Sequence, residues 1–358
     1  MRMCFRSIIA RANDIGLQGT KPSGYATTPV CAGPRVGTLM KNAARLAILF
    51  AFTYMSIAFA QTYPNHPIRV IIPWPPGQAT DLAARMVSER LVPALGQPLV
   101  MDNKPGAGGT IGSEFASKQP ADGYTLLAGS SGPISISPNV QKVAYDPLKD
   151  FAPISLLAVN SYVLVVNPSV PAKNVPELIA LLRANPGKYS FSSSGSGASS
   201  HLASVLFNSM ANVTAIHVPY KGSSPSVTDL VSGQVAYTME TVPGVISFVK
   251  SGRLRALGVS SAKRSTAMPE LPTIADDLPG YEMSGWIGFM APAGTPSEIS
   301  GRLSREVRKI LEIPEIRERF LALGQEPAGN TPEEYAGFLR RQNDRYAAIV
   351  KQAGLKLD

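Results

Sequence analysis

Three polar segments of this sequence have the composition of a small-molecule binding site. Residues 73–81 (PWPPGQATD) close a β-branched run, and glycine and serine dominate residues 104–112 (KPGAGGTIG) and 192–201 (SSSGSGASSH). Each segment is expected to lead into a helix, whose first N–H groups and partial positive charge attract an anion. Hydroxyl and backbone donors with few acids or bases predict binding of a carboxylate rather than catalysis.

Two of these segments allow a second interpretation. Asp81 would either contact a ligand or cap the helix that begins beside it. The glycines of residues 104–112 would let the backbone approach a ligand closely. Their last glycine has the wrong offset for a GxGxxG dinucleotide motif, and no GKS or GKT follows for a phosphate loop. We therefore expect no nucleotide at this segment.

The serines near His201 make an exported hydrolase a weaker alternative. The GxSxG nucleophile motif is absent from this segment, because Gly195 and Gly197 are only two residues apart. A hydrolase would also need Ser194 or Ser199 to face a histidine base that is oriented by an acid. The alternative fails if these side chains do not face one another.

Metal, cofactor and thiol chemistry are not expected. His66, His201 and His217 are separated from one another, and no HExxH motif joins them. Cys4 and Cys31 both lie in the first 60 residues, so the remainder of the chain has no disulfide or thiol nucleophile. We expect neither a catalytic residue nor a bound metal.

Residues 40–60 have the features of a complete export signal. Lys41 and Arg45 precede an uncharged apolar run, and the run ends in Ala-Phe-Ala. That run is about 14 residues, short of the roughly 20 needed to span a bilayer. Cleavage is expected after Ala60, which gives a periplasmic protein. Residues 1–39 are then an extension from a wrongly chosen upstream start codon.

The charge of the chain argues against a nucleic-acid partner. Seven Lys and Arg residues and one acid in residues 1–60 account for six of the nine excess positive charges, which leaves +3 for residues 61–358. A nucleic-acid surface would need clustered Lys and Arg. About 300 residues lie near the size at which a single core divides, so we expect two lobes.

Alternation of strand and helix signals over residues 68–128 predicts an α/β lobe with a largely parallel sheet, and further α/β units follow it. The expected strands are 68–72, 99–101, 124–128, 154–166, 190–193, 215–218, 235–239, 254–260 and 281–291, and the expected helices are 81–95, 113–118, 176–184, 201–210, 225–232, 297–323 and 332–354. We interpret residues 154–166 as the crossing out of the first lobe and residues 281–291 as the return. Lobe 1 would comprise residues 61–163, lobe 2 residues 164–282, and residues 283–358 would return to lobe 1 and form the C-terminal helices.

The chain resembles the Bug-type extracytoplasmic solute receptors, the substrate-binding proteins of tripartite tricarboxylate transporters. The resemblance extends from residue 63 to residue 358 and includes PWPPGQATDLAARM, NKPGAGGTIGSEFA, PADGYTLLAGSSG, SSSGSGASSHLA, VPYKGSSPSVTDLVSGQV and GWIGFMAPAGTP. It implies a type II periplasmic-binding-protein-like fold, with two α/β lobes around a ligand cleft that are joined by crossing segments. Closure on the ligand would be a hinge motion.

The resemblance also implies which residues contact the ligand. They are Trp74, Pro76, Gly77, Thr80, Gly109, Thr110, Ser130 and Ser131 from the first lobe, and Ser194, Gly197, Ser199, His201, Tyr220, Lys221, Gly222 and Ser223 from the second. Trp74 would be a ring beneath the ligand or a buried plug, and Gln78 stands where relatives commonly have glycine. Glu240 would bind an amino group or, as the preferred reading, face water. Lys221 would add a cationic contact or remain solvated.

These features predict a monomeric receptor that captures a small organic carboxylate and delivers it to the membrane permease subunits of such a transporter. A di- or tricarboxylate, an aromatic acid and an amino acid are all compatible with the polar segments. The alternative of a different class is a receptor that signals its ligand to a sensor kinase.

Overall fold

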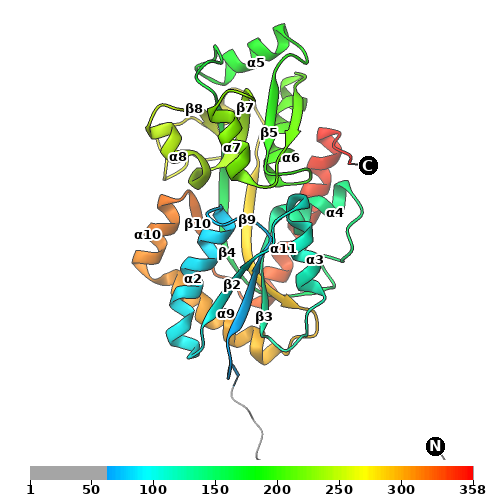
Figure 1. Ribbon diagram of the computed structural model, residues 1–358, viewed down its shortest axis with the longest axis vertical. Helices are drawn as coiled ribbons and strands as arrows, with labels where there is room; N and C mark the ends of the chain where they lie inside the picture. Colours follow the sequence, from blue (N-terminus) through cyan, green and yellow to red (C-terminus); the bar gives the residue numbers. More distant parts are fainter. Residues whose placement is uncertain (1–62, 358) are drawn as a thin grey trace, which may run out of the picture. The chain divides into compact units, whose positions relative to one another are not determined.

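The computed structural model describes residues 63–357. The predicted export signal in residues 40–60, its cleavage after Ala60 and the extension in residues 1–39 lie outside this range. Figure 1 shows two groups of strands and helices joined by two long strands, β4 (Phe151–Val166) and β9 (Ser284–Pro292). The predicted two-lobed α/β fold is therefore confirmed.

The first lobe is built on three parallel strands. β1 (Ile68–Ile72) lies between β2 (Leu99–Asn103) and β3 (Thr125–Ser130), and β9 pairs with β3 in the antiparallel sense. β1 is apolar apart from Arg69, as expected for a strand with neighbours on both sides and helices on its faces. The helices of this lobe are α2 (Ala79–Leu95), α3 (Thr110–Ser117), α9 (Ser297–Glu312) and α10 (Pro314–Ala322).

The second lobe repeats this plan around β5 (Ser190–Ser193). β5 is parallel to β6 (Ile216–Pro219) and to β7 (Tyr237–Thr241), while β7 and β8 (Arg255–Val259) are antiparallel to β4. The helices of this lobe are α5 (Val175–Ala184), α6 (Ser199–Ala211), α7 (Ser223–Val231) and α8 (Val242–Lys250). Because β4 pairs with strands of both lobes, the strand order runs continuously as β2-β1-β3-β9-β4-β7-β5-β6.

Shorter elements and one long helix complete the structure. The long C-terminal helix, α11 (Pro332–Ala353), contacts α6 of the second lobe and η2 beside the first-lobe strand β3, and Figure 1 shows it running from one lobe to the other. The shorter elements are η1 (Ala107–Gly109), η2 (Gly132–Ile136), α4 (Ser137–Val140), η3 (Ile274–Asp276) and β10 (Gln325–Pro327).

One helix prediction was wrong, and one helix was not predicted. The single helix expected over 297–323 is interrupted at Ile313, and Pro314 begins α10. Proline lacks the N–H that would continue the first helix but suits the first turn of the next one. The sequence also gave no expectation of α8, whose first turn contains Pro243 and Gly244, residues with weak helical propensity.

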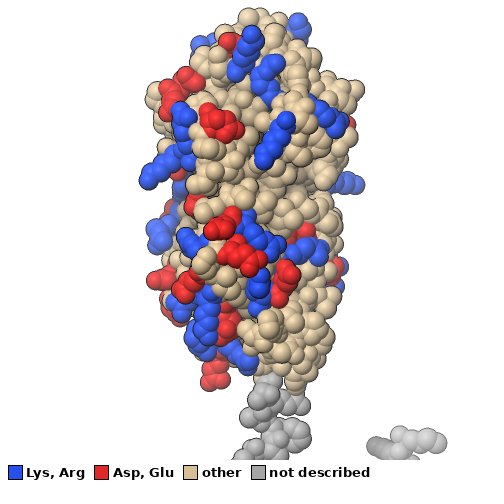
Figure 2. Space-filling model, turned by 90° about the vertical axis from the view of Figure 1, so that its left-hand side faces the viewer, with Lys and Arg blue, Asp and Glu red and all other residues tan. Residues whose placement is uncertain are grey.

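Charges of both signs intermingle on the face shown in Figure 2. Arg90 of α2, for example, pairs with Glu315 of α10 at 2.9 Å between Nη2 and Oε2. Within residues 63–357, no helix is both long and apolar enough to cross a membrane.

Candidate binding site

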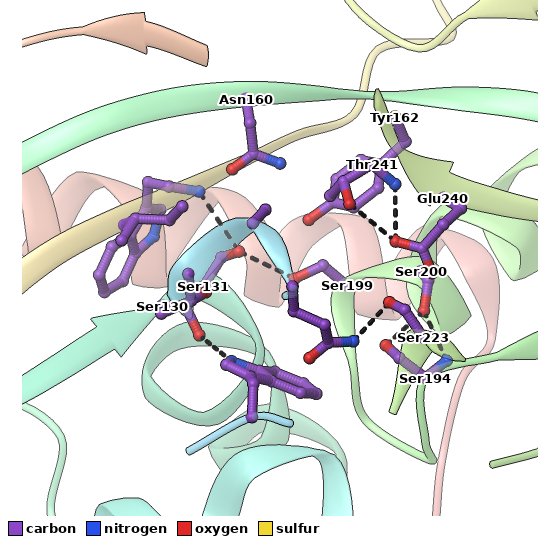
Figure 3. Close-up of a pocket in the computed structure, with 16 residues that line it drawn as sticks. Ser130, Ser131, Asn160, Tyr162, Ser194, Ser199, Ser200, Ser223, Glu240 and Thr241 are labelled. Atoms are coloured by element: carbon purple, nitrogen blue, oxygen red, sulfur yellow. Dashed lines mark hydrogen bonds between the residues drawn. The ribbon is translucent and has the colours of Figure 1, made fainter. Parts of the chain in front are cut away.

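A polar cavity of about 50 Å³ lies between the two lobes. It is lined by Trp74, Gln78, Ala79, Thr80, Ser130 and Ser131 of the first lobe, by Asn160, Tyr162, Trp286 and Ile287 of β4 and β9, and by Ser194, Ser199, Ser200, Ser223, Glu240 and Thr241 of the second lobe. Figure 3 shows these side chains around a common space, with Asn160 and Tyr162 on the strand that joins the lobes.

Four helices begin at this cavity. Thr80 in α2, Ser200 in α6, Ser223 in α7 and Thr241, the N-cap of α8, all line it. None of these four helices has a side-chain cap. Of the helices that begin away from the cavity, Asn174 caps α5 and Thr331 caps α11, whereas α9 and α10 have no side-chain cap. The cavity therefore faces free N–H groups and the positive ends of four helix dipoles.

Hydrogen bonds between polar side chains join the lobes at the cavity. The hydroxyls of Ser131 and Ser199 are 2.8 Å apart, and the Gln78 side-chain amide donates to the Ser223 hydroxyl. Each pair links a first-lobe residue to a second-lobe residue. The structure is therefore a closed arrangement of the two lobes.

Glycines allow the loops of the two lobes to approach closely. Gly108 has φ +64°, and a Cβ added there would lie 2.5 Å from the Ser196 carbonyl oxygen. A Cβ on Gly222 would lie 2.5 Å from the Pro75 ring. Gly108 therefore makes the close approach expected of residues 104–112, and the group that it approaches is the backbone of the other lobe.

The structure brings part of the predicted set together at the cavity. The predicted residues that line it are Trp74, Gln78, Thr80, Ser130, Ser131, Ser194, Ser199, Ser223 and Glu240. The predicted residues outside its lining are Pro76, Gly77, Asp81, Gly109, Thr110, Gly197, His201, Tyr220, Lys221 and Gly222. Pro76 and Gly77 instead line an adjoining cavity of about 220 Å³, which shares Gln78, Ser223 and Thr241 with the first.

Trp74 is an almost fully buried wall of the cavity, with 7% of its surface exposed. Its indole N–H donates to the Ser130 hydroxyl at 2.9 Å. A Cβ added to Gly109 or to Gly132 would press against the ring, at 3.2 and 3.3 Å. Trp74 therefore fills space in the core and also lines the cavity.

Asp81 is held by protein groups outside the cavity lining. Its carboxylate accepts hydrogen bonds from the Gly77 N–H, the Arg85 guanidinium and the Asn103 amide, each at 2.9 Å. Burial alone would raise the pKa of this carboxyl, but the three donors together hold the pKa below its usual value. Asp81 therefore fixes the loop that precedes α2.

Glu240 points into the cavity, and the reading that it faces water was wrong. The residue is only 2% exposed. Its Oε1 accepts hydrogen bonds from the N–H and the hydroxyl of Thr241 at 2.7 and 2.9 Å, whereas its Oε2 is buried without a hydrogen bond. Burial raises the pKa of this carboxyl, although the nearby Ser223 hydroxyl and Thr241 oppose that effect.

His201 lies against a different cavity, next to His217. The two imidazole rings stack with centroids 3.7 Å apart, and His201 Nδ1 accepts the Gly197 N–H at 3.3 Å. Burial, and then the neighbouring His217, lower the pKa of His201 to about 3. Ser194 and Ser199 bond to other serines, so these two serines and His201 do not form a catalytic arrangement. The hydroxyl of Ser193 instead lies 2.7 Å from Nε2 of His217.

The loop before α7 is directed away from the cavity. The Tyr220 hydroxyl donates to the Asp229 carboxylate at 2.5 Å, and Lys221 is exposed. Burial and Asp229 together raise the pKa of Tyr220 to about 12. The exposed position of Lys221 agrees with the alternative in which its side chain remains solvated.

Several lining residues were not predicted from the sequence. Asn160, Tyr162 and Trp286 lie on the two strands that join the lobes. One signal was present, because Asn160 interrupts the long apolar run of residues 154–166. No group of three or more His, Cys, Asp or Glu side chains that could hold a metal occurs in residues 63–357.

Two α/β lobes that close over a polar interlobe cavity define a solute-binding protein of the periplasmic type. The chain belongs to the tripartite tricarboxylate transporter family of receptors, whose model matches residues 83–355. It is 39% identical over 301 residues to protein BugT of Bordetella pertussis, which covers 83% of this chain and 92% of that one. It is a Bug-type receptor and not an enzyme.

Two solved structures with ligands share this fold. The structure of Rpa4515 from R. palustris with adipate has 33% sequence identity and a TM-score of 0.80, and covers 82% of this chain and 99% of that one. MatC from Rhodopseudomonas palustris with bound malate has 28% identity and a TM-score of 0.76, over 80% of this chain and all of that one.

Proposed function

We propose that this receptor captures a small organic carboxylate in the cavity between its lobes and delivers it to the membrane subunits of a tripartite tricarboxylate transporter. The convergence of four uncapped helix N-termini on one cavity carries this proposal. A helix N-terminus stabilises an anion by about 0.3–1 kcal/mol, and by up to about 2 kcal/mol where it is partly buried. A carboxylate would therefore bind without an arginine.

The lining residues agree with this mode of recognition. The described residues that line the cavity include no Lys or Arg, so the groups available to an anion there are hydroxyls, amides and the helix N-termini. Serine and threonine hydroxyls can donate to a carboxylate or hold water molecules around it. The adipate and malate in the structures of relatives are dicarboxylates, which supports a carboxylate ligand for this chain.

A thermal-shift screen tests the carboxylate assignment. The purified protein, denatured and refolded to remove bound ligand, would be scanned against organic acids and amino acids. A ligand at about 100 times its Kd stabilises the folded state by about 2.7 kcal/mol, which for a chain of this size is a rise in Tm of roughly 5 °C. The substitution Thr80→Ala at the start of α2 should reduce the shift, whereas Thr266→Ala, at an exposed site, should not. No shift with any acid would contradict the proposal.

Export is proposed from the signal in residues 40–60, and delivery is proposed from the family to which the chain belongs. N-terminal sequencing of the protein from periplasmic extracts should begin at Gln61 if the signal is cleaved after Ala60. Cells that lack this receptor should no longer take up the acid that raises the Tm, and the wild-type gene should restore uptake. Unchanged uptake would contradict delivery to a transporter while leaving ligand binding intact.

A further inference from the structure

Two side-chain oxygens that belong to the lining of the interlobe cavity have no hydrogen-bond partner within residues 63–357. They are Oε2 of Glu240 and Oε1 of Gln78. Both residues are more than nine-tenths buried, at 2% and 8% exposure. An acceptor buried without a donor is costly, and a carboxylate buried without a counter-charge is more so. Apart from the Ser223 hydroxyl beside Glu240, the described residues supply no donor to these two oxygens, and the indole N–H of Trp286 in the same lining lacks an acceptor.

We propose that the ligand carries an ammonium group that binds Glu240 Oε2 and Gln78 Oε1, so that the carboxylate captured by this receptor belongs to an amino acid. This inference rests on the proposed carboxylate-binding function. It adds a substrate class that the helix N-termini alone do not select.

The charges around the cavity support an ammonium. Glu240 and Tyr162 are the two titratable residues among the described lining residues. The pKa of the Tyr162 hydroxyl is raised by burial, so the phenol stays neutral. A ligand ammonium would supply the counter-charge for Glu240, and an ion pair of this kind is favoured in a buried site only when its hydrogen bonds are satisfied.

The cavity lining presents separate partners for the two groups. In Figure 3, Glu240 lies on one side with Ser200 and Ser223, Ser130 and Ser131 lie on the other side, and Ser199 stands between them. An amino acid could thus direct its ammonium to Glu240 and its carboxylate to the serines and the N-terminus of α2.

The competing assignment is a protonated Glu240 that donates its own proton to a ligand carboxylate. Burial, which raises the pKa of this carboxyl, would favour that form in the empty cavity. The two assignments predict opposite responses to pH. An ammonium requires ionised Glu240, so affinity should rise with pH, whereas a protonated Glu240 donor would make affinity fall.

Matched pairs of acids with and without an amino group test the proposal by titration calorimetry. The pairs are aspartate and succinate, glutamate and glutarate, leucine and 4-methylvalerate, and phenylalanine and 3-phenylpropionate. In at least one pair the amino acid should bind at least about ten-fold more tightly, a difference of about 1.4 kcal/mol. Glu240→Gln should reduce this preference to less than about three-fold. The matched control Glu298→Gln, an exposed glutamate in the first turn of α9, should retain it.

The outcomes separate this inference from the proposed function. Tighter binding of the deaminated partner in every pair that binds would overturn the ammonium and leave the carboxylate receptor standing. Absence of binding by both members of every pair would overturn both proposals.

Titration of wild-type protein between about pH 5 and pH 8 gives a second readout that does not depend on a folded variant. His201 and His217 line another cavity and have pKa values of about 3 and 4, so neither titrates in this range. Amino-acid affinity that rises with pH supports the ammonium, and affinity that falls with pH overturns it.

Discussion

The stacked histidines of the second lobe predict that the receptor loses stability in mild acid. His201 and His217 lie face to face in a partly buried cluster with Phe191. Burial lowers the pKa of His217 to about 4, and burial together with His217 lowers the pKa of His201 to about 3. In the unfolded chain both groups return to a pKa near 6.5. The unfolded state therefore binds more protons between these limits.

The sign and size of the effect follow from this difference. Because the folded pKa values are depressed, the stability is fully present above about pH 6.5 and is lost as the pH falls toward 4 and 3. At pH 5 the unfolded pKa of His201 is about 1.5 units above the pH, which at about 1.36 kcal/mol per unit is a loss of about 2 kcal/mol. His217 is more exposed, so its share is discounted to about 1 kcal/mol. The expected total is about 3 kcal/mol.

Urea unfolding at pH 7.5 and pH 5, followed by circular dichroism without ligand, would measure this loss. The double variant His201→Gln, His217→Gln should lose about 3 kcal/mol less than wild type between the two pH values. His66→Gln, which alters an exposed histidine, should behave as wild type. The raised pKa of Glu240 has the opposite sign, since stability from that group falls as pH rises, and both proteins share it. Equal losses in the wild type and the double variant, within about 0.5 kcal/mol, would refute this reasoning.

Three further substitutions separate closure, cavity shape and stability. Gly108→Ala places a Cβ 2.5 Å from the Ser196 carbonyl and should weaken ligand binding at least about ten-fold by opposing closure. Calorimetry and small-angle scattering would test it, and normal affinity with a compact liganded form would contradict it. Gly285→Ala should collide with the Tyr162 hydroxyl, abolish the ligand-induced Tm shift and cost about 1–3 kcal/mol of stability; an unchanged shift would count against it. Thr331→Ala removes the capping box of α11 and should lower the urea-derived stability by about 1 kcal/mol with no change in ligand affinity.

Local sequence patterns predicted most of the strands, because the residues that determine a strand lie within it and directly beside it. β1 could be recognised from a β-branched run closed by proline and glycine, and α11 from its Thr331 to Glu334 capping box. The position of Pro314 also contained the information needed to divide the helix of residues 297–323. α8 is different, since its Pro243 and Gly244 disfavour helix and the surrounding second-lobe core, which includes Val245, stabilises it.

The candidate site was predictable only where it is built from loops at helix N-termini. Segments rich in glycine, serine and threonine indicated Thr80 and Ser199 directly, whereas Ser131 was expected from the family resemblance. Asn160 and Trp286 depend on strand pairing instead, because β4 and β9 are antiparallel and place Asn160 opposite Gly285, next to the pair of Val159 and Trp286. No local pattern contains that register, so these residues become part of a site only after the two lobes are connected.

The glycine-rich segment shows why composition can predict a close approach without identifying what approaches. Gly108 faces Ser196 of the second lobe, and the hydroxyl pair of Ser131 and Ser199 joins the lobes at the cavity. A ligand that bridges the lobes and the contacts that hold them together thus stabilise the same closed state. It follows that affinity measures lobe closure as well as ligand contact. A substitution in this segment can therefore weaken binding even where the substituted residue makes no contact with the ligand.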